Sequence, residues 1–157
     1  MSVLWDIWSI TAENARTIDI DRLPDGDLVH PIYRELRVRE HSLDIGRFWH
    51  IVHYLLTGEG ERQETPLSRA IYGTHNINED HYFVTPEDAK VIASALADVR
   101  REDFEPRLRV EDVQGLYYGN RFGDRDGLAC CVDALEDLRD HYLAMARRDY
   151  GGLISLG

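Results

Sequence analysis

The stretch VLWDIWSI, residues 3–10, decides the fold. If this stretch is extended, its apolar side chains alternate between one face, Val3, Trp5 and Ile7, and the other, Leu4, Trp8 and Ile10. Strands that are apolar on both faces lie inside a sheet and are covered on both sides. We therefore expect a central β-strand close to the N-terminus, with room for a neighbour on each edge.

A second short strand is predicted at the C-terminus. Gly151 and Gly152 break the preceding helical pattern, and Leu153–Leu156 follows as a run of four residues. A strand this short is not stable alone, so we expect it to pair with the opening strand. Few strands among several helices indicate an α+β fold. The 157 residues suit one domain, over 1–157, with a small sheet that includes the N-terminal and C-terminal strands and packs against several helices.

The helices are predicted from apolar spacing and from caps. The clearest is Ile45–Leu56, which is entered from Asp44, ended by Gly58 and carries Trp49 on its apolar face, where we expect this side chain to be buried. Thr-Pro pairs, with threonine as N-cap and proline at the first helical position, begin two more. The full set expected is 12–18, 45–56, 66–72, 86–99, 110–116 and 128–148, with a turn at 23–27 and a loop at 119–127.

Charge limits the classes of partner. Eighteen basic residues stand against 29 acidic ones, so the net charge is -11. Such a surface repels nucleic-acid phosphates and anionic membranes, and we predict binding to neither. It favours solubility or a basic protein partner. The adjacent Cys130 and Cys131 are badly placed to pair, and no signal peptide or membrane span is recognised, so we expect a cytoplasmic protein. The sequence leaves the oligomeric state open.

Two histidines lie three residues apart, at positions 50 and 53. This spacing on a helix can place two imidazoles on one metal ion. Further ligands would have to come from His75, Asp80 and His81, in a distant loop. The simpler interpretation is that His53 is partly buried and hydrogen-bonded to a neighbour, and we predict no metal and no cofactor.

Ser68, together with His53 and Asp44, suggests a nucleophilic triad. No Gly-x-Ser-x-Gly turn surrounds Ser68, so support of the helix start is the favoured role. Arg69 beside it offers a cation for an anionic group. We expect any site where the Ile45–Leu56 helix ends and the Pro66–Tyr72 helix begins, with Asp44, His53, Ser68, Arg69 and His75 as candidate binding residues.

Several motifs resemble those of the YfbM-like family, small bacterial proteins grouped as a domain of unknown function. They are LDI with a later tryptophan (43–49), HYLLTG (53–58), PLSRAI with a later glycine (66–73), YFVTPE (82–87) and GLISL (152–156). The resemblance covers nearly the whole chain and implies a single α+β domain. It carries over no activity, cofactor or catalytic residue. Gly46 stands where the family often has an acid, and the family also accepts Asp in place of His50, which weakens a two-histidine metal site.

Two functional hypotheses follow. The first is a non-catalytic cytoplasmic binding or regulatory module that neutralises a basic partner; the failure of each catalytic template and the net charge favour it. The alternative is a small hydrolase or metal-dependent enzyme with its site between the Ile45–Leu56 and Pro66–Tyr72 helices. A concave pocket that holds His53 among other titratable groups would favour the enzyme. A flat acidic face would favour the binding module.

Overall fold

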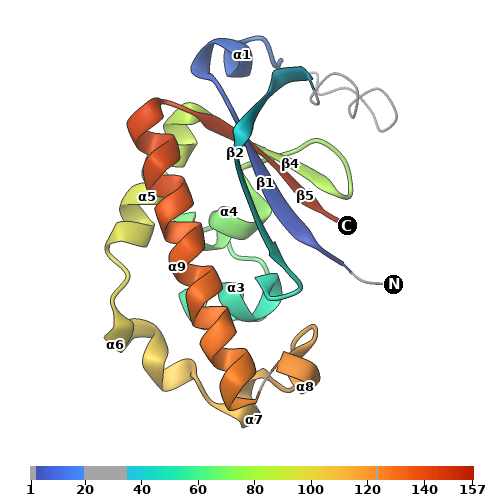
Figure 1. Ribbon diagram of the computed structural model, residues 1–157, viewed down its shortest axis with the longest axis vertical. Coiled ribbons are helices and arrows are strands. Elements are labelled where there is room, and N and C mark those ends of the chain that lie inside the picture. Colours follow the sequence, from blue (N-terminus) through green and yellow to red (C-terminus); the bar gives the residue numbers. More distant parts are fainter. Residues whose placement is uncertain (1–2, 20–34, 123) are drawn as a thin grey trace.

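The computed structural model describes residues 3–19, 35–122 and 124–157. Its centre is a five-stranded antiparallel sheet with the order β2-β1-β5-β4-β3. The long helices all lie on one side of this sheet, and both chain ends lie at the same end of it (Figure 1). The strands are β1 Trp5–Ile10, β2 Arg37–Gly46, β3 His75–Asn76, β4 His81–Val84 and β5 Gly151–Leu156.

The expected pairing of the two terminal strands is confirmed. β5 runs antiparallel to β1 from Trp5 opposite Leu156 to Ile10 opposite Gly151. Its other edge pairs with β4, so the last strand of the chain occupies the middle of the sheet. The two faces of β1 are covered unequally. Ile7 is fully buried beneath the helices, whereas on the other face Ile10 is fully buried and Trp8 only half-buried.

The predicted α+β class and most of the predicted helices are confirmed. Short helices at 101–104, 105–107 and 119–122 were missed, the last of them inside the loop expected at 119–127. The helices expected at 12–18 and 110–116 end earlier than predicted. The helices are α1 Ala12–Arg16, α3 Trp49–Thr57, α4 Pro66–Tyr72, α5 Pro86–Ala97, α6 Arg101–Phe104, η3 Glu105–Arg107, α7 Val110–Val113, α8 Gly119–Phe122 and α9 Arg125–Arg148. Thr65 and Thr85 cap α4 and α5 as expected, since their side chains accept hydrogen bonds from the backbone amides of Ser68 and Asp88. The turn predicted at 23–27 lies outside the described residues.

The predicted start of the Ile45–Leu56 helix is wrong. Residues up to Gly46 belong to β2, and α3 begins only at Trp49. Gly46 has φ +56, which ends the strand, and the Asp44 carboxylate accepts a hydrogen bond of 2.7 Å from its amide. An inward apolar side chain at Ile45 suits a strand as well as a helix, so spacing alone did not separate them. The rest of β2 was missed because it is an edge strand rich in charge, and charged edges obscure apolar alternation.

The glycine pair before the last strand was also misread as a break. Gly151 and Gly152 are inside β5, and the helix ends at Asp149 in the left-handed conformation (φ 56). A Cβ on Gly152 would lie 2.9 Å from Ile7 Cδ1 and 2.9 Å from Met145 Cε. A side chain at position 152 would have to displace these two side-chain ends, because helix and sheet approach each other closely here.

The main core lies between the sheet and helices α3, α4, α5 and α9. Trp49 is 8% exposed within it, which confirms the expectation for this residue. A smaller apolar cluster covers part of the other face of the sheet and comprises Ile10, Ala15, Ile77, Phe83 and Leu153. Among the described residues, no helix combines the length and apolarity needed to cross a membrane.

Candidate functional site

His53 and Ser68 meet as the sequence suggested, but they meet inside the protein. His53 Nε2 lies 2.8 Å from Ser68 Oγ, and both residues have no exposed surface. His53 Nδ1 lies 3.0 Å from the carbonyl oxygen of Glu59, to which it donates. Ser68 Oγ accepts a second hydrogen bond of 2.8 Å from the backbone amide of Gln63. We call these two side chains and their two backbone partners the first histidine centre.

The hydrogen bonds of the first histidine centre define one protonation state. Because Nδ1 donates to a carbonyl, Nε2 is left as the acceptor for the Ser68 hydroxyl. Burial lowers the pKa of His53 to about 4, against the opposing effect of the Glu59 carbonyl. The imidazole is therefore neutral near pH 7, and each of its nitrogens has a partner. Chemically, this arrangement ties the loop 57–64 to α3 and α4.

His50 also binds the loop 57–64, at the carbonyl next to the one that His53 binds. Its Nε2 donates to the carbonyl of Gly60 over 2.6 Å, and its Nδ1 accepts a hydrogen bond of 2.8 Å from the amide of Tyr117. The two histidines of α3 thus hold successive carbonyls of the loop rather than one metal ion. Within residues 3–19, 35–122 and 124–157, no group of three metal-binding side chains is suitably arranged for a metal.

The other sequence-predicted residues lie apart from this centre. Asp44 is exposed on β2, and the histidine nitrogen that a triad would assign to it is taken by Glu59. Arg69 forms a half-exposed ion pair with Glu64 at 3.1 Å. His75, on β3, lies 3.4 Å from the carboxylate of Asp88 on α5. Of the five candidate residues, the structure therefore brings only His53 and Ser68 into contact with each other. The other three make their contacts elsewhere.

Sequence reasoning missed a second histidine centre, formed by Ser9 of β1, His41 of β2 and His141 of α9. Ser9 Oγ lies 2.5 Å from His41 Nδ1 and 3.4 Å from His141 Nε2. The two imidazole rings stack with centroids 4.4 Å apart, and the Tyr150 ring meets His41 edge-on. A serine hydroxyl can donate to one imidazole while it accepts from the other. The centre links the edge strand of the sheet to the long helix.

Both imidazoles of the second histidine centre favour the neutral form. Burial, with a smaller contribution from His41, lowers the pKa of His141 to about 3. Burial also lowers the pKa of His41, and the Arg148 guanidinium adds to this effect. Ser9 is fully buried and His141 is 8% exposed, so this centre too is internal. The only sequence signal for it was a polar residue at a buried position of an apolar strand.

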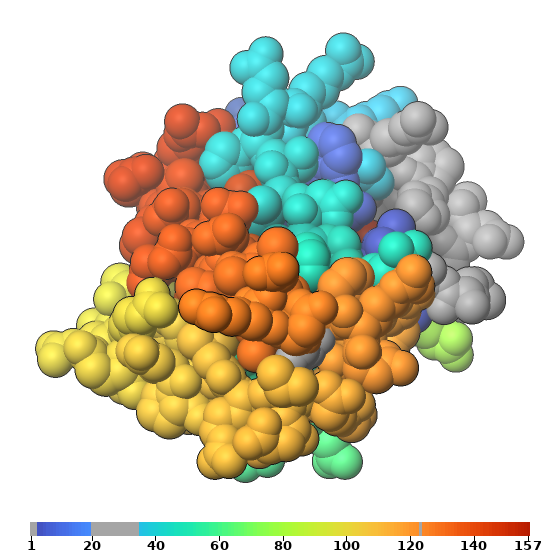
Figure 2. All heavy atoms as spheres, turned by 60° about the horizontal axis from the view of Figure 1, so that its bottom comes forward, coloured from blue at the N-terminus to red at the C-terminus, as the bar shows by residue number. Residues whose placement is uncertain are grey.

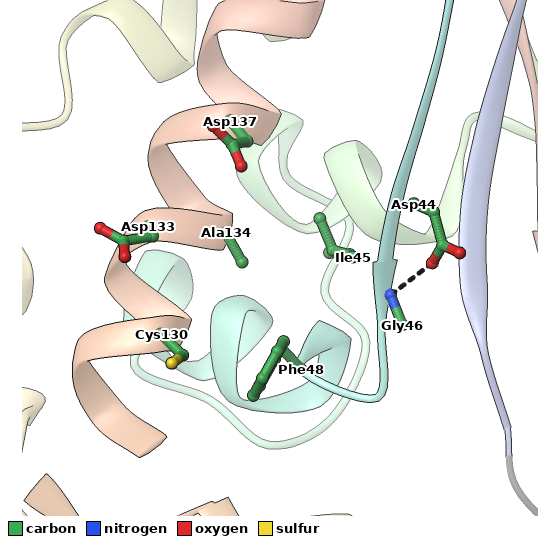
Figure 3. A pocket seen from close by; sticks show the side chains of 8 residues that line it. All are labelled: Asp44, Ile45, Gly46, Phe48, Cys130, Asp133, Ala134 and Asp137. Carbon is green, nitrogen blue, oxygen red and sulfur yellow. Dashed lines mark hydrogen bonds between the residues drawn. The ribbon is translucent and has the colours of Figure 1, made fainter. Parts of the chain in front are cut away.

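An open hollow of about 450 Å³ lies between the end of β2 and the middle of α9. Ile45 and Ala134 face each other across it, and Phe48 and Cys130 lie at one end (Figure 3). The carboxylates of Asp133 and Asp137 project from α9; Asp44 lines the β2 side, with its carboxylate turned toward the amide of Gly46. The hollow combines an apolar floor with an acidic rim. Of the candidates predicted from sequence, Asp44 alone lines it.

The acidic rim continues along the exposed side of α9. Carboxylates recur there at helical spacing, at Asp126, Asp133, Glu136, Asp137 and Asp140. Between the first and last of these, the one basic residue is the half-buried Arg139. We call these five side chains the acidic stripe. It concentrates part of the net negative charge on one face.

Comparison with known proteins gives a family and a fold. Over residues 1–155 the chain matches the model of a family described as a domain of unknown function, DUF1877. Its structure is similar to the crystal structure of a protein of unknown function, YfbM from Escherichia coli, with a TM-score of 0.74 and 20% identity. The alignment covers 98% of this chain and 99% of that one. At this identity the likeness shows the fold alone. No curated protein matches the chain.

Proposed function

The chain belongs to the DUF1877 family of domains of unknown function, and since membership brings no activity with it, we propose a function from the geometry. The protein is a non-catalytic binding module of the cytoplasm. It receives a basic segment of a partner protein in the hollow between β2 and α9. The observation that carries this proposal is the pairing of an apolar floor with carboxylates on the rim of that hollow.

The chemistry of the hollow fits an arginine or lysine side chain. Long basic side chains carry an apolar stem and a charged head. The stem would lie on Ile45, Phe48 and Ala134, and the head would reach the carboxylates of Asp133 and Asp137. Because the floor accepts the stem, a side chain bound there gains more than an exposed ion pair, which contributes little by itself.

The acidic stripe supports the same proposal at longer range. Exposed carboxylates of one sign raise the rate at which an oppositely charged partner arrives. The stripe follows α9 on both sides of the hollow, since Asp126 precedes it and Asp140 follows it in the helix. The net charge of -11 adds to this attraction. Association with a basic partner would accordingly weaken as salt is added.

The enzyme alternative has its nucleophile at Ser68, and the surroundings of this residue disfavour it. The hydroxyl has no exposed surface, donates to His53 and accepts from the Gln63 amide. A substrate carbonyl would have to displace the loop to reach it. A fluorophosphonate, which labels activated serines, is therefore expected to leave Ser68 unmodified. Labelling that is lost in Ser68→Ala would contradict the non-catalytic proposal.

Binding is tested with a labelled oligo-arginine peptide, followed by fluorescence anisotropy at several salt concentrations. We expect saturable binding that weakens with salt. The double variant Asp133→Asn, Asp137→Asn should lower the affinity about tenfold, equivalent to about 1.4 kcal/mol. A third change, Phe48→Ala, removes apolar floor without changing the charge and should lower affinity further.

The matched control is the double variant Glu61→Gln, Glu79→Gln. Both residues are exposed, and neither lines the hollow, so the control removes the same charge elsewhere. The proposal requires the control to bind almost as well as the unchanged protein. Equal losses in the two double variants would mean that net charge alone attracts the peptide. Absence of saturable binding would refute the proposal.

A further inference from the structure

A second hollow, of about 510 Å³, lies on the surface near the start of the chain, where Tyr117 contacts Val3. It is lined by Tyr117, Tyr118, Asn120 and Arg121, around the start of α8. This part of the chain, orange in Figure 2, lies on the surface beside the segment that carries α6 and α7. We call it the tyrosine hollow. It shares no lining residue with the hollow beside β2.

The tyrosine hollow differs from its neighbours in charge. The hollow beside β2 has three carboxylates in its lining, and a hollow of about 590 Å³ between α9 and α7 has Asp133. The lining of the tyrosine hollow contains no carboxylate, although 29 of the residues of this chain are acidic. Its one charged lining residue is Arg121.

Arg121 is exposed and, within the described part of the chain, forms no ion pair. Other arginines nearby in the sequence do, such as Arg109 with Glu111 at 2.8 Å. The guanidinium of Arg121 instead lies over the ring of Tyr118, 6.0 Å from its centroid, and the guanidinium of Arg47 lies 5.3 Å from the same centroid. A guanidinium presents five N–H donors, and an interaction with a ring face uses few of them. Its donors therefore remain available to an oxyanion.

Two further lining residues can donate hydrogen bonds into the same hollow. The Tyr117 hydroxyl accepts a hydrogen bond of 2.6 Å from the amide of Val3 and donates to none of the described residues, so it has a proton to donate. The side-chain amide of Asn120 makes no hydrogen bond to the described residues and carries two donors. Together with Arg121 they supply a cation and neutral donors, which is the combination that binds phosphate and carboxylate groups.

Aromatic rings form the wall of this hollow and hold it rigid. The Tyr118 ring stacks on Phe122 at 5.5 Å and lies 4.7 Å from the ring of Tyr117, which stacks on Trp49. Tyr118 has φ 58, a conformation that non-glycine residues rarely adopt and that recurs at binding sites. The next residue must be glycine, because a Cβ on Gly119 would lie 1.6 Å from the Val113 carbonyl oxygen. Ring contacts and backbone conformation thus together set the position of the Tyr118 ring.

We propose that the tyrosine hollow binds a small organic anion that carries a flat ring. The oxyanion lies against Arg121, Asn120 and the Tyr117 hydroxyl, and the ring lies along the tyrosine wall. This site is separate from the proposed recognition of a basic partner, which has the opposite charge preference. A phosphate ester and a carboxylate share the required chemistry, and the experiment distinguishes them.

Isothermal titration calorimetry of the full chain tests the proposal with four probes. Phenyl phosphate and benzoate carry both ring and anion, inorganic phosphate lacks the ring, and phenol lacks the anion. We expect saturable binding of at least one ring-bearing anion, at least tenfold weaker binding of inorganic phosphate, and none of phenol. A preference between phenyl phosphate and benzoate identifies the anionic group.

Arg121→Gln should weaken the ring-bearing anion about tenfold and leave the fold unchanged, because the side chain is exposed. The matched control is Arg147→Gln, another exposed arginine, in the last turn of α9. Tyr118→Gly removes the ring while it suits the backbone conformation, and it should abolish the preference for phenyl phosphate over inorganic phosphate. The proposal is overturned if neither ring-bearing anion binds, if inorganic phosphate binds equally well, or if both arginine variants lose affinity alike.

Discussion

The two histidine centres contain the same chemical groups and differ in how the chain assembles them. Each pairs a buried serine hydroxyl with a neutral imidazole. In the first, His53 and Ser68 are 15 residues apart and belong to successive helices. In the second, Ser9 and His141 are 132 residues apart, and Ser9 also contacts His41 on a third element. The first ties down a loop, whereas the second ties an edge strand to a helix.

This difference shows that the role of a buried polar pair depends on what it holds. The first histidine centre satisfies backbone groups of a loop that has no regular structure of its own, at Glu59 and Gln63. The second satisfies only side chains, because strand β2 is already paired with β1. Loss of the first should therefore release a segment, and loss of the second should weaken packing between two elements that otherwise remain formed.

The largest effect we expect is destabilisation by acid. The pKa of His53 is lowered from 6.5 to about 4, and that of His141 from 6.5 to about 3. Above pH 6.5 both are neutral in the folded and unfolded states, so their contribution is fully present. As the pH falls below 6.5, the unfolded chain binds protons first, and stability is lost. Between pH 6.5 and 4 each histidine should cost roughly 3 kcal/mol, at about 1.4 kcal/mol per pKa unit.

The measurement is the free energy of unfolding by urea at a series of pH values. His53→Gln and His141→Gln replace each titrating group by an amide that can still form hydrogen bonds. Each variant is expected to be less stable at pH 7 and to show a flatter dependence on pH. If both variants retain the full slope of the unchanged protein, other groups cause the acid sensitivity and the neutral-histidine account is wrong.

The second largest effect is a difference in stability between the variants Ser68→Ala and Ser9→Ala. Ser68→Ala removes the donor to His53 and the acceptor for the Gln63 amide, which leaves one buried and one half-buried group unsatisfied. We expect it to cost about 2–3 kcal/mol, since each unsatisfied buried group costs about 1–3 kcal/mol. Ser9→Ala leaves two imidazoles that still stack on each other, and we expect about 1 kcal/mol. Thermal unfolding of the two variants checks the order, and a larger loss for Ser9→Ala would reverse the comparison.

Contacts between residues close in the sequence could be predicted, and contacts between distant residues could not. Helices α4 and α5 were predictable because Thr65 and Thr85 act on amides three residues away. The contact between His53 and Ser68 was predictable because one short loop joins their helices. The second histidine centre was not, because nothing near Ser9 in the sequence specifies which residues of β2 and α9 will face it.

The residues that line the two hollows could not be predicted from the sequence either. Asp44 was a candidate for the wrong reason, as a triad member at a helix start, whereas it lies on an edge strand beside α9. The acidic spacing along α9 was visible in the sequence, but its partner surface at Ile45 depends on how β2 packs. The left-handed conformation of Tyr118 had no sequence signal at all, because positive φ at an aromatic residue has no characteristic pattern.

The smallest effect concerns His50, whose role is intermediate between the two centres. It holds the Gly60 carbonyl of the loop, like the first centre, and it also accepts from Tyr117, 67 residues away, like the second. His50→Ala leaves two polar groups without these partners, but the side chain is only half-buried, so water can replace much of the loss. We expect a cost of about 1 kcal/mol, the value of a typical hydrogen bond.

Amide hydrogen exchange locates the effect more sharply than global stability, because local opening is reported residue by residue. The Tyr117 amide should exchange faster in His50→Ala and unchanged in Ser68→Ala, while the Gln63 amide should show the reverse. Faster exchange of both amides in both variants would show that the loop 57–64 and the segment around Tyr117 open as one unit, and the two ties could then no longer be treated as separate.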